Sequence, residues 1–419
     1  MRIEIRHGRV IDPASGRDDV ESLFIADGHI VGLAEAPAGF TADQVIDASG
    51  LIVCPGLIDL SARKLTQESE LTAAVAGGVT TVCCPPDTDP PLDEPGLITP
   101  LLQRADAVGK ARVAPIGALT VGLQGETLAE LVDLARAGCI AFSQAGRHLA
   151  DSRTLRRALQ YAATFDLPVW LHAEDPALGN EGVAHEGEVS ARLGLAGVPV
   201  SAETVALHTL IELANEAGAR VHITRLSSAA GVEIVSRAKA RGARITCDVS
   251  IHSLHYCDAS IGYFDTNARL SPPLRSPRDR DGLRKGLSEG VIDALCSDHT
   301  PVSDDGKLLP FAEARPGSIG LELLLPLALR WAEIEKRSLT SALTPVTCAP
   351  AALAGLPGGR IDAGAPADLC LFDPNATWTV GNDTLHSRYR NTLCLGETLR
   401  GRVKQTLVGG RVVFLHQEQ

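Results

Sequence analysis

The sequence has no uninterrupted apolar run near the roughly 20 residues that a helix needs to cross a bilayer. Its first residues, Met1-Arg2-Ile3-Glu4-Ile5-Arg6, alternate as a strand does and lack the apolar stretch of a signal peptide. These absences argue against a membrane protein and against export. We therefore expect a cytoplasmic protein with no membrane partner.

A basic stripe is also missing, and the formal net charge is -12. Both features argue against binding to nucleic acid or to an anionic membrane surface. None of the ten cysteines forms a Cys-x-x-Cys pair, and several lie inside apolar runs, namely Cys54, Cys139, Cys247 and Cys370. Free, buried thiols are therefore expected rather than disulfides.

Short apolar runs alternate with amphipathic stretches through most of the 419 residues. The apolar runs predict strands at Leu51–Ile58, Thr80–Cys84, Val113–Ala118, Ile140–Ser143, Val169–His172, Arg220–Thr224, Arg244–Val249 and Ala294–Ser297. Helices are predicted between them, among them Leu128–Ala137, Ser152–Phe165 and Ala229–Ala240. Eight strands with helical crossovers predict an α/β fold of the (β/α)8 TIM barrel type.

The two ends of the chain have a different pattern. Residues 1–52 and 356–419 carry short strand patterns joined by tight turns such as Asp27-Gly28 and Gly409-Gly410. We expect these two segments to form one composite β-sandwich domain. It would pack closely on a barrel made of residues 53–355, because no Ser-rich or charged linker separates the parts.

In such barrels the chemistry takes place at the C-terminal ends of the strands. Read in order, those ends include Ser61-Ala62-Arg63, Ser143-Gln144, His172-Ala173-Glu174-Asp175, Thr224-Arg225 and Ser297-Asp298-His299. The arginine in the first of these is unusual, because a guanidinium group has no lone pair to give a metal and stays charged at any ordinary pH.

Several further motifs follow one another along nearly the whole chain: Cys54-Pro55-Gly56-Leu57-Ile58-Asp59-Leu60, Gly78-Val79-Thr80-Thr81-Val82, Glu186-Gly187-Glu188, Pro272-Pro273-Leu274-Arg275, Gly317-Ser318-Ile319-Gly320-Leu321-Glu322 and Ala365-Pro366-Ala367-Asp368-Leu369. In their order and spacing they resemble the dihydroorotases, the cyclic amidohydrolases of pyrimidine synthesis. The resemblance implies an amidohydrolase-type barrel that in the family holds two metal ions.

The resemblance places the six metal positions of the family at Ser61, Arg63, Gln144, His172, Arg225 and Asp298. In the family these are two histidines, a carboxylate, two further histidines and the catalytic aspartate. Only His172 and Asp298 match. Because zinc needs about three or four protein ligands, we expect no metal and no cofactor, and we regard Asp298 as a vestigial catalytic residue.

Three positions that the resemblance assigns to substrate binding have also changed. Leu65 stands where the family has an arginine, and Asp87 and Ser271 stand where it has asparagines. The Asp87 carboxylate is expected to repel an anionic substrate. Losing the metal that lowers the pKa of water from roughly 15.7 to about 7 forfeits on the order of 10 kcal/mol of activation. We therefore expect no useful dihydroorotase activity.

The two arginines suggest a replacement for the missing cations. We expect Arg63 and Arg225 to point into the barrel mouth and to neutralise Asp298, since an uncompensated buried carboxylate would be costly. The alternative is that both side chains turn to solvent, as exposed arginines commonly do.

Other polar residues near the strand ends have plainer explanations. His172 is expected to be hydrogen-bonded rather than metal-bound, and Glu174 and Asp175 to be surface or capping carboxylates. A less favoured hypothesis is an improvised metal site formed by Cys83, Cys84 and Cys296 with His172, because buried thiols usually act as small apolar side chains. A substitute catalytic set of His252, His255 and His299 has no recognisable ligand spacing.

The resemblance is most specific to bacterial dihydroorotase-like chains that are non-catalytic and assemble with the catalytic chain of aspartate transcarbamoylase, since those chains also lack the strand-one histidines. It implies a structural subunit with that transferase chain as partner, in a homo-oligomer. Two alternatives stay open. One is an active cyclic amidohydrolase with an altered or absent metal site, for which zinc would be expected. The other is a sensor that binds a small ligand in the old pocket.

Overall fold

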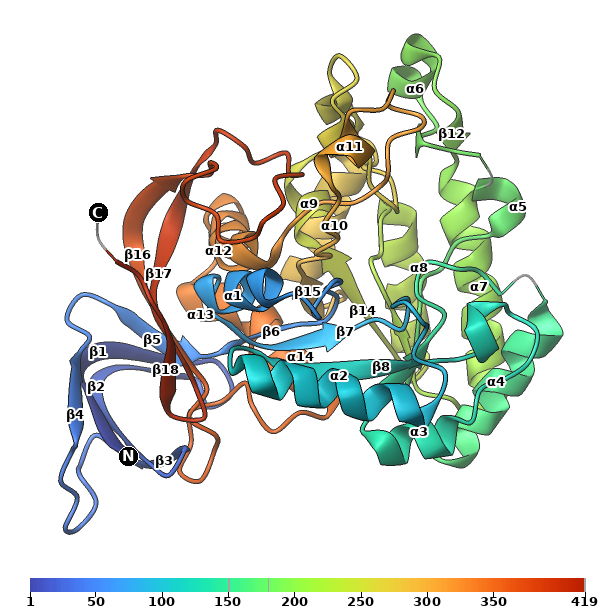
Figure 1. The fold of residues 1–419 in the computed structure, drawn as a ribbon. Coiled ribbons are helices and arrows are strands. Elements are labelled where there is room, and N and C mark those ends of the chain that lie inside the picture. Colours follow the sequence, from blue (N-terminus) through green and yellow to red (C-terminus); the bar gives the residue numbers. More distant parts are fainter. Residues whose placement is uncertain (150, 180, 418–419) are drawn as a thin grey trace.

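The computed structural model describes residues 1–149, 151–179 and 181–417. A barrel surrounded by helices forms the larger part, and strands from the two ends of the chain gather on one side of it (Figure 1). No helix in these three ranges is both long and apolar enough to span a membrane.

Eight parallel strands form the barrel and are hydrogen-bonded in chain order. They are β6 (Leu57–Asp59), β7 (Val79–Cys84), β8 (Arg112–Ala118), β9 (Ala141–Ser143), β10 (Val169–Leu171), β13 (Val221–Ile223), β14 (Ile245–Ser250) and β15 (Ala294–Cys296). A parallel bridge between Ala62 and His299 joins the first strand to the last. The predicted (β/α)8 barrel is therefore confirmed. Its mouth, the end where the C-terminal ends of the strands meet, carries all six positions of the metal constellation.

Helices follow the strands and cover the outside of the barrel (Figure 1). The longer ones are α1 (Glu68–Ala76), α2 (Pro95–Val108), α3 (Leu131–Ala137), α4 (Ser152–Thr164), α7 (Val200–Ala217), α8 (Ala229–Ala240), α10 (Pro277–Ser288) and α12 (Leu324–Ile334). Shorter elements are α5 (Pro176–Gly179), α6 (Glu188–Leu193), α9 (Ile251–His255), α11 (Asp304–Lys307), α13 (Leu339–Leu343), α14 (Cys348–Ala354), β11 (Ala184–His185) and β12 (Gly197–Val198). Side-chain caps fix some of the starts: Asp151 accepts from Arg153 and Thr154 at α4, and Ser228 accepts from Gly231 at α8.

Strands from both ends of the chain join one eight-stranded sheet. It contains β1 (Arg2–Asp12), β2 (Arg17–Ala26), β3 (His29–Leu33), β4 (Gln44–Asp47), β5 (Ile52–Pro55), β16 (Leu369–Thr379), β17 (Thr398–Val408) and β18 (Arg411–Leu415). The contact between the two ends is the antiparallel pair of β5 and β16. A separate hydrophobic cluster that includes Ile3, Leu23 and Leu371 packs on this sheet. The sheet and its own core are consistent with the expected terminal sandwich.

One predicted strand is wrong in its extent. The run Leu51–Ile58 divides at Gly56 into β5, which belongs to the terminal sheet, and β6, which opens the barrel. A Cβ atom at Gly56 would lie 2.2 Å from the Thr80 side chain, so only glycine lets the chain cross there. The apolar pattern is continuous across this point because both strands are fully buried.

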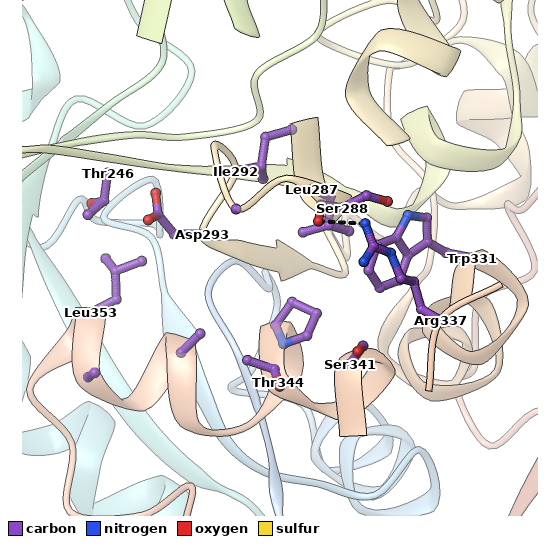
Figure 2. A pocket seen from close by; sticks show the side chains of 14 residues that line it. Thr246, Leu287, Ser288, Ile292, Asp293, Trp331, Arg337, Ser341, Thr344 and Leu353 are labelled. Carbon is purple, nitrogen blue, oxygen red and sulfur yellow. Dashed lines mark hydrogen bonds between the residues drawn. The ribbon is translucent and has the colours of Figure 1, made fainter. Parts of the chain in front are cut away.

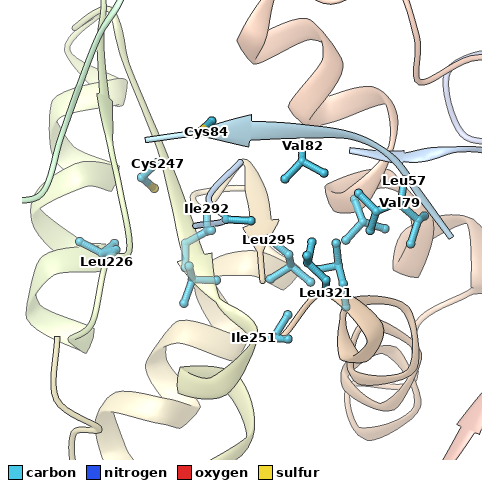
Figure 3. Packing of buried hydrophobic residues seen from close by; sticks show 14 of the residues in the cluster. Leu57, Val79, Val82, Cys84, Leu226, Cys247, Ile251, Ile292, Leu295 and Leu321 are labelled. Atoms are coloured by element: carbon cyan, nitrogen blue, oxygen red, sulfur yellow. The ribbon is translucent and has the colours of Figure 1, made fainter. Parts of the chain in front are cut away.

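Leucine, isoleucine and valine side chains from strands and helices pack together to form the main core (Figure 3). Leu57, Val79 and Leu321 lie together in this view, and Leu226 and Cys247 lie near its other end. All ten cysteines are free thiols, and nine of them are buried, so the expectation of buried thiols is confirmed. The predicted helix at 128–137 begins three residues later than expected, at Leu131.

Candidate functional site

Two guanidinium groups converge on one carboxylate at the barrel mouth. The distance from Nη1 of Arg225 to Oδ1 of Asp298 is 3.5 Å, and Nη1 of Arg63 lies 3.7 Å from the same oxygen. The three residues follow β13, β15 and β6, and β15 and β6 are neighbours where the barrel closes. Only 7% of the Arg225 side chain and 9% of the Asp298 side chain are exposed. The arginines therefore lie where we expected them, beside Asp298 and not in solvent.

Each arginine is held by further hydrogen bonds. Arg63 donates from Nε to Asp87 at 2.7 Å and from Nη1 to the Thr300 hydroxyl at 3.1 Å. Nη1 of Arg225 donates to the Ser271 carbonyl oxygen at 2.8 Å, and its backbone N–H donates to Asp248 at 2.7 Å. These contacts fix the orientation of both guanidinium groups.

The backbone at the centre of the site is strained. Arg225 has a φ of 55° and Asp298 has a φ of 46°. Positive φ angles are uncommon for residues other than glycine, and such residues cluster at functional sites. Arg225 and Asp298 therefore both have a backbone conformation of the kind that is common at functional sites.

Burial and the arginine charges act on Asp298 in opposite directions. Burial raises the pKa of the Asp298 carboxyl above its ordinary value, although Arg225 and Arg63 work to lower it. At Asp87 burial also works to raise the pKa, but the charge and hydrogen bond of Arg63 outweigh it and the pKa is lowered. Asp87 therefore serves as a counterion of Arg63, which differs from the expected free charge that repels a substrate.

The other predicted positions do not face one another. Gln144 is buried and donates from Nε2 to the Thr120 hydroxyl at 2.8 Å. Ser61 is buried, and its carbonyl oxygen accepts from the backbone of His299 at 3.1 Å. Leu65 is only 2% exposed and packs in the main core. Ser271 contributes its backbone carbonyl oxygen to the site, where it accepts from Arg225.

His172 lies among polar partners in the mouth. Its Nδ1 is 3.2 Å from the Thr224 carbonyl oxygen, and its Nε2 is 3.4 Å from Glu174. Asp175 accepts two backbone N–H groups at the start of α5, so its capping role is confirmed. Glu174 is not a free surface carboxylate, since His148 also lies 3.8 Å from it.

The three histidines considered as a substitute catalytic set, His252, His255 and His299, do not form one. Nδ1 of His299 accepts from the Gly320 backbone at 3.1 Å, so its Nε2 carries the proton and donates to Glu70 at 2.9 Å. His255 is bound to the Leu327 carbonyl oxygen, and burial lowers the pKa of His252 to about 4. Within the described residues, no group of three or more His, Cys, Asp or Glu side chains is arranged to hold a metal ion.

Sequence reasoning missed two buried acids beneath the mouth. Asp59 accepts from the backbone and the hydroxyl of Ser297, both at 2.6 Å, and burial raises its pKa to about 7. Asp248 lies 2.9 Å from Nε2 of His222 and also accepts from the Arg225 backbone. Asp248 stands on the predicted strand Arg244–Val249, where alternation into the barrel interior was the available signal. Asp59 ends β6, one residue beyond the predicted strand Leu51–Ile58.

Comparison with known proteins places this architecture. A family model described as dihydro-orotase-like matches residues 50–230, and one described as amidohydrolase family matches residues 147–414. A "dihydroorotase-like protein" from Pseudomonas aeruginosa is 45% identical over 98% of this chain and 99% of its own. The chain belongs to the dihydroorotase-like amidohydrolases.

Some other relatives are named "dihydroorotase-like protein" and some "dihydroorotase". A protein from Pseudomonas putida named "dihydroorotase-like protein" is 44% identical over 98% of this chain and 99% of its own. One from Syntrophotalea carbinolica named "dihydroorotase" is 40% identical over 99% of each chain. The solved L-hydantoinase (dihydropyrimidinase) from Arthrobacter aurescens shares the fold, with a TM-score of 0.87, 23% identity and coverage of 99% of this chain and 96% of that chain.

The donor set of this dihydroorotase-like chain does not fit a pair of zinc ions. Zinc is bound by thiolate, imidazole or carboxylate groups, and only His172 and Asp298 offer one of these at the six positions. Arg63 and Arg225 bring positive charge to the mouth and have no lone pair to offer. The site is thus organised around ion pairs between side chains.

Proposed function

We propose that this chain is a dihydroorotase homologue that has lost hydrolysis and acts as a structural subunit for the catalytic chain of aspartate transcarbamoylase. The observation that carries the proposal is the placement of two guanidinium groups within 4 Å of Asp298. In this role the chain would stabilise an active oligomer of the transferase and would need neither metal nor cofactor.

The ion pairs support the loss of hydrolysis for two reasons. Asp298 is the position that would take a proton from an attacking water, yet Arg63 and Arg225 share its Oδ1. The two cations oppose the rise in pKa that burial causes at Asp298, and they occupy the oxygen that would accept the proton. Nothing in the described mouth provides the cluster of ligands that would lower the pKa of water instead. The intact barrel and terminal sheet are what a scaffold needs.

The direct test is co-expression of this chain with the transferase catalytic chain. We expect a complex larger than either component by light scattering, and a transferase activity well above that of the catalytic chain alone. Hydrolysis of dihydroorotate by the complex should equal the buffer rate, with and without added zinc.

An Asp298→Asn variant is the matched control, because it removes the vestigial carboxylate and keeps its shape. Under the proposal, complex size and transferase activity stay unchanged in this variant. A transferase chain that is fully assembled and fully active without this chain would refute the structural role.

A cyclic amidohydrolase with altered chemistry is the second candidate. It is favoured by the name "dihydroorotase" of relatives that are 38 to 40% identical and by the retention of His172 and Asp298. Assays on dihydroorotate, hydantoin and dihydrouracil with added zinc test it. Turnover that disappears in Asp298→Asn would establish this candidate in place of the first for the mouth.

A further inference from the structure

Three cavities adjoin one another, two at the end of the barrel opposite the mouth and one between α12 and the terminal sheet. A cavity of about 600 Å³ lies between α10 and the α13–α14 region, and Figure 2 shows Thr246 and Leu353 at one end of it and Arg337 at the other. Arg337 also lines a cavity of about 630 Å³ between α12 and β17. Thr246 and Leu353 also line a third, of about 260 Å³, at the N-terminal ends of β10 and β13. The shared residues join the three into one basal groove.

The basal groove is rich in arginine, although the whole chain is acidic. Its lining includes Arg9, Arg220, Arg244, Arg330, Arg337 and Arg400. The acidic residues that line it, within the described part of the chain, are Asp293 and Glu333. Asp293 is neutralised by Lys239 at 2.6 Å. Arg9 is paired with Asp18 and Arg330 with Glu397, so the excess positive charge of the groove comes from the other four arginines. The formal net charge of the whole molecule is -12.

Two of these cations lack a matching carboxylate. Arg337 donates to the Ser288 carbonyl oxygen at 2.9 Å, as the dashed line in Figure 2 shows. Arg400 donates to the Pro374 carbonyl oxygen at 2.9 Å and to the Asn375 side chain at 2.6 Å. Neither forms an ion pair within the described residues, and both are exposed.

At the other end of the groove two cations share one acid. Arg220 and Arg244 both lie 3.1 Å from the same oxygen of Asp166. One carboxylate cannot balance two guanidinium groups, so an excess of positive charge stands at each end of the groove. A ligand that met both ends would have to reach across the central cavity.

The walls between the charged ends are largely apolar. Leu287, Ile292, Trp331 and Leu353 line the central cavity, and Leu329 and Leu399 line the one beside Arg400. A guanidinium group presents paired N–H donors that match the two oxygens of a carboxylate. An extended peptide places successive side chains on opposite faces. Acidic side chains could thus meet the arginines while apolar ones enter the cavities.

We propose that the basal groove binds an extended, acidic segment of a partner protein in which glutamate or aspartate alternates with apolar residues. Three joined cavities suit a chain better than a compact ligand, which would fill one of them. This inference does not depend on the proposed function, because the groove lies at the other end of the barrel from Asp298.

Fluorescence anisotropy of a labelled peptide of alternating glutamate and leucine tests the inference. About twelve residues are enough, since such a peptide spans roughly 40 Å when extended. We expect saturable binding to the full-length chain that weakens at least about tenfold in Arg337→Ala/Arg400→Ala and weakens with added salt. A glutamine–leucine peptide of the same length should not bind.

The matched control is Arg104→Ala/Arg278→Ala, which removes the same charge from exposed positions outside the groove. It should leave the affinity within about twofold. Equal losses in both double variants, or no peptide binding up to about 1 mM, would overturn the proposal. Complete competition by an equal concentration of inorganic phosphate would overturn it too, in favour of a small-anion site. If the double variant does not fold, Arg400→Glu on β17 replaces it and should abolish binding.

Discussion

Removing the Arg225 guanidinium should destabilise the fold through Asp298. The two charged groups are 3.5 Å apart, and only 7% and 9% of their side chains are exposed. At an effective dielectric constant of about 20, Coulomb attraction over this distance is roughly 5 kcal/mol. Breaking a buried pair typically costs about 3 to 5 kcal/mol. Arg63 still lies 3.7 Å from the same Asp298 oxygen, so the loss should lie toward the lower end of that range. We expect Arg225→Met to fall in that range near pH 8.

The cost should depend on pH with a defined sign. The pKa of Asp298 is already raised by burial, and losing Arg225 raises it further. Asp298 in the variant therefore takes up a proton at higher pH than in the wild type, and protonation removes the charge that Arg225 no longer balances. The destabilisation of Arg225→Met should shrink as the pH falls from about 8 to about 5.

A double-mutant cycle separates the ion pair from other effects. Urea unfolding would be measured for Arg225→Met, Asp298→Asn and the double variant. Asp298→Asn removes the stranded charge, so the double variant should recover about 2 kcal/mol or more relative to Arg225→Met. Met is unbranched like Arg, so the strain at a φ of 55° is unchanged. Arg241→Met on the surface is the control. A loss below about 1 kcal/mol for Arg225→Met at both pH values would refute this account of the site.

Three further outcomes test the packing around the site. Burial raises the pKa of Asp59 to about 7, so its contribution to stability is full below about pH 4 and falls by about 4 kcal/mol as the pH rises to 7. In Asp59→Asn the free energy of unfolding should therefore change less between pH 5 and 8 than in the wild type. Glu70→Leu should cost about 3 kcal/mol in urea unfolding, because His299 and Ser387 lose their acceptor, whereas Glu68→Leu on the exposed face of α1 should change little. Gly56→Ala should lower the free energy of unfolding by about 1 to 3 kcal/mol, because its Cβ would clash with Thr80. Gly96→Ala should not lower it, because a Cβ there meets nothing within 4 Å. A neutral Gly56→Ala would contradict the close crossing of β5 into β6.

The barrel could be predicted because its signals are local. Each strand is a short apolar run, and parallel strands place their C-terminal ends at one mouth. That rule alone brings Arg63, Arg225 and Asp298 together, although they are far apart in the sequence. The division at Gly56 could not be predicted, since both strands that it separates are equally apolar.

The partners of the site residues were beyond the sequence. Asp87 lies after β7 and meets Arg63 only because of the path of its loop. His299 depends on Glu70 from α1, which in turn accepts from Ser387 near the other end of the chain. Such pairings arise from tertiary packing, and no periodicity in the sequence marks them. Gln144 likewise turns to Thr120 for a reason that only the folded neighbourhood supplies.

The bridge beside the altered residues has a consequence for how such a chain can change. The first and last strands are joined by main-chain bonds: Arg63 N–H to the His299 carbonyl at 2.9 Å, and His299 N–H to the Ser61 carbonyl at 3.1 Å. These bonds are indifferent to the side chains that residues 61 and 63 carry. The ring can therefore stay closed whichever side chains stand at these two positions, so a barrel of this kind can change its strand-one side chains without losing its shape.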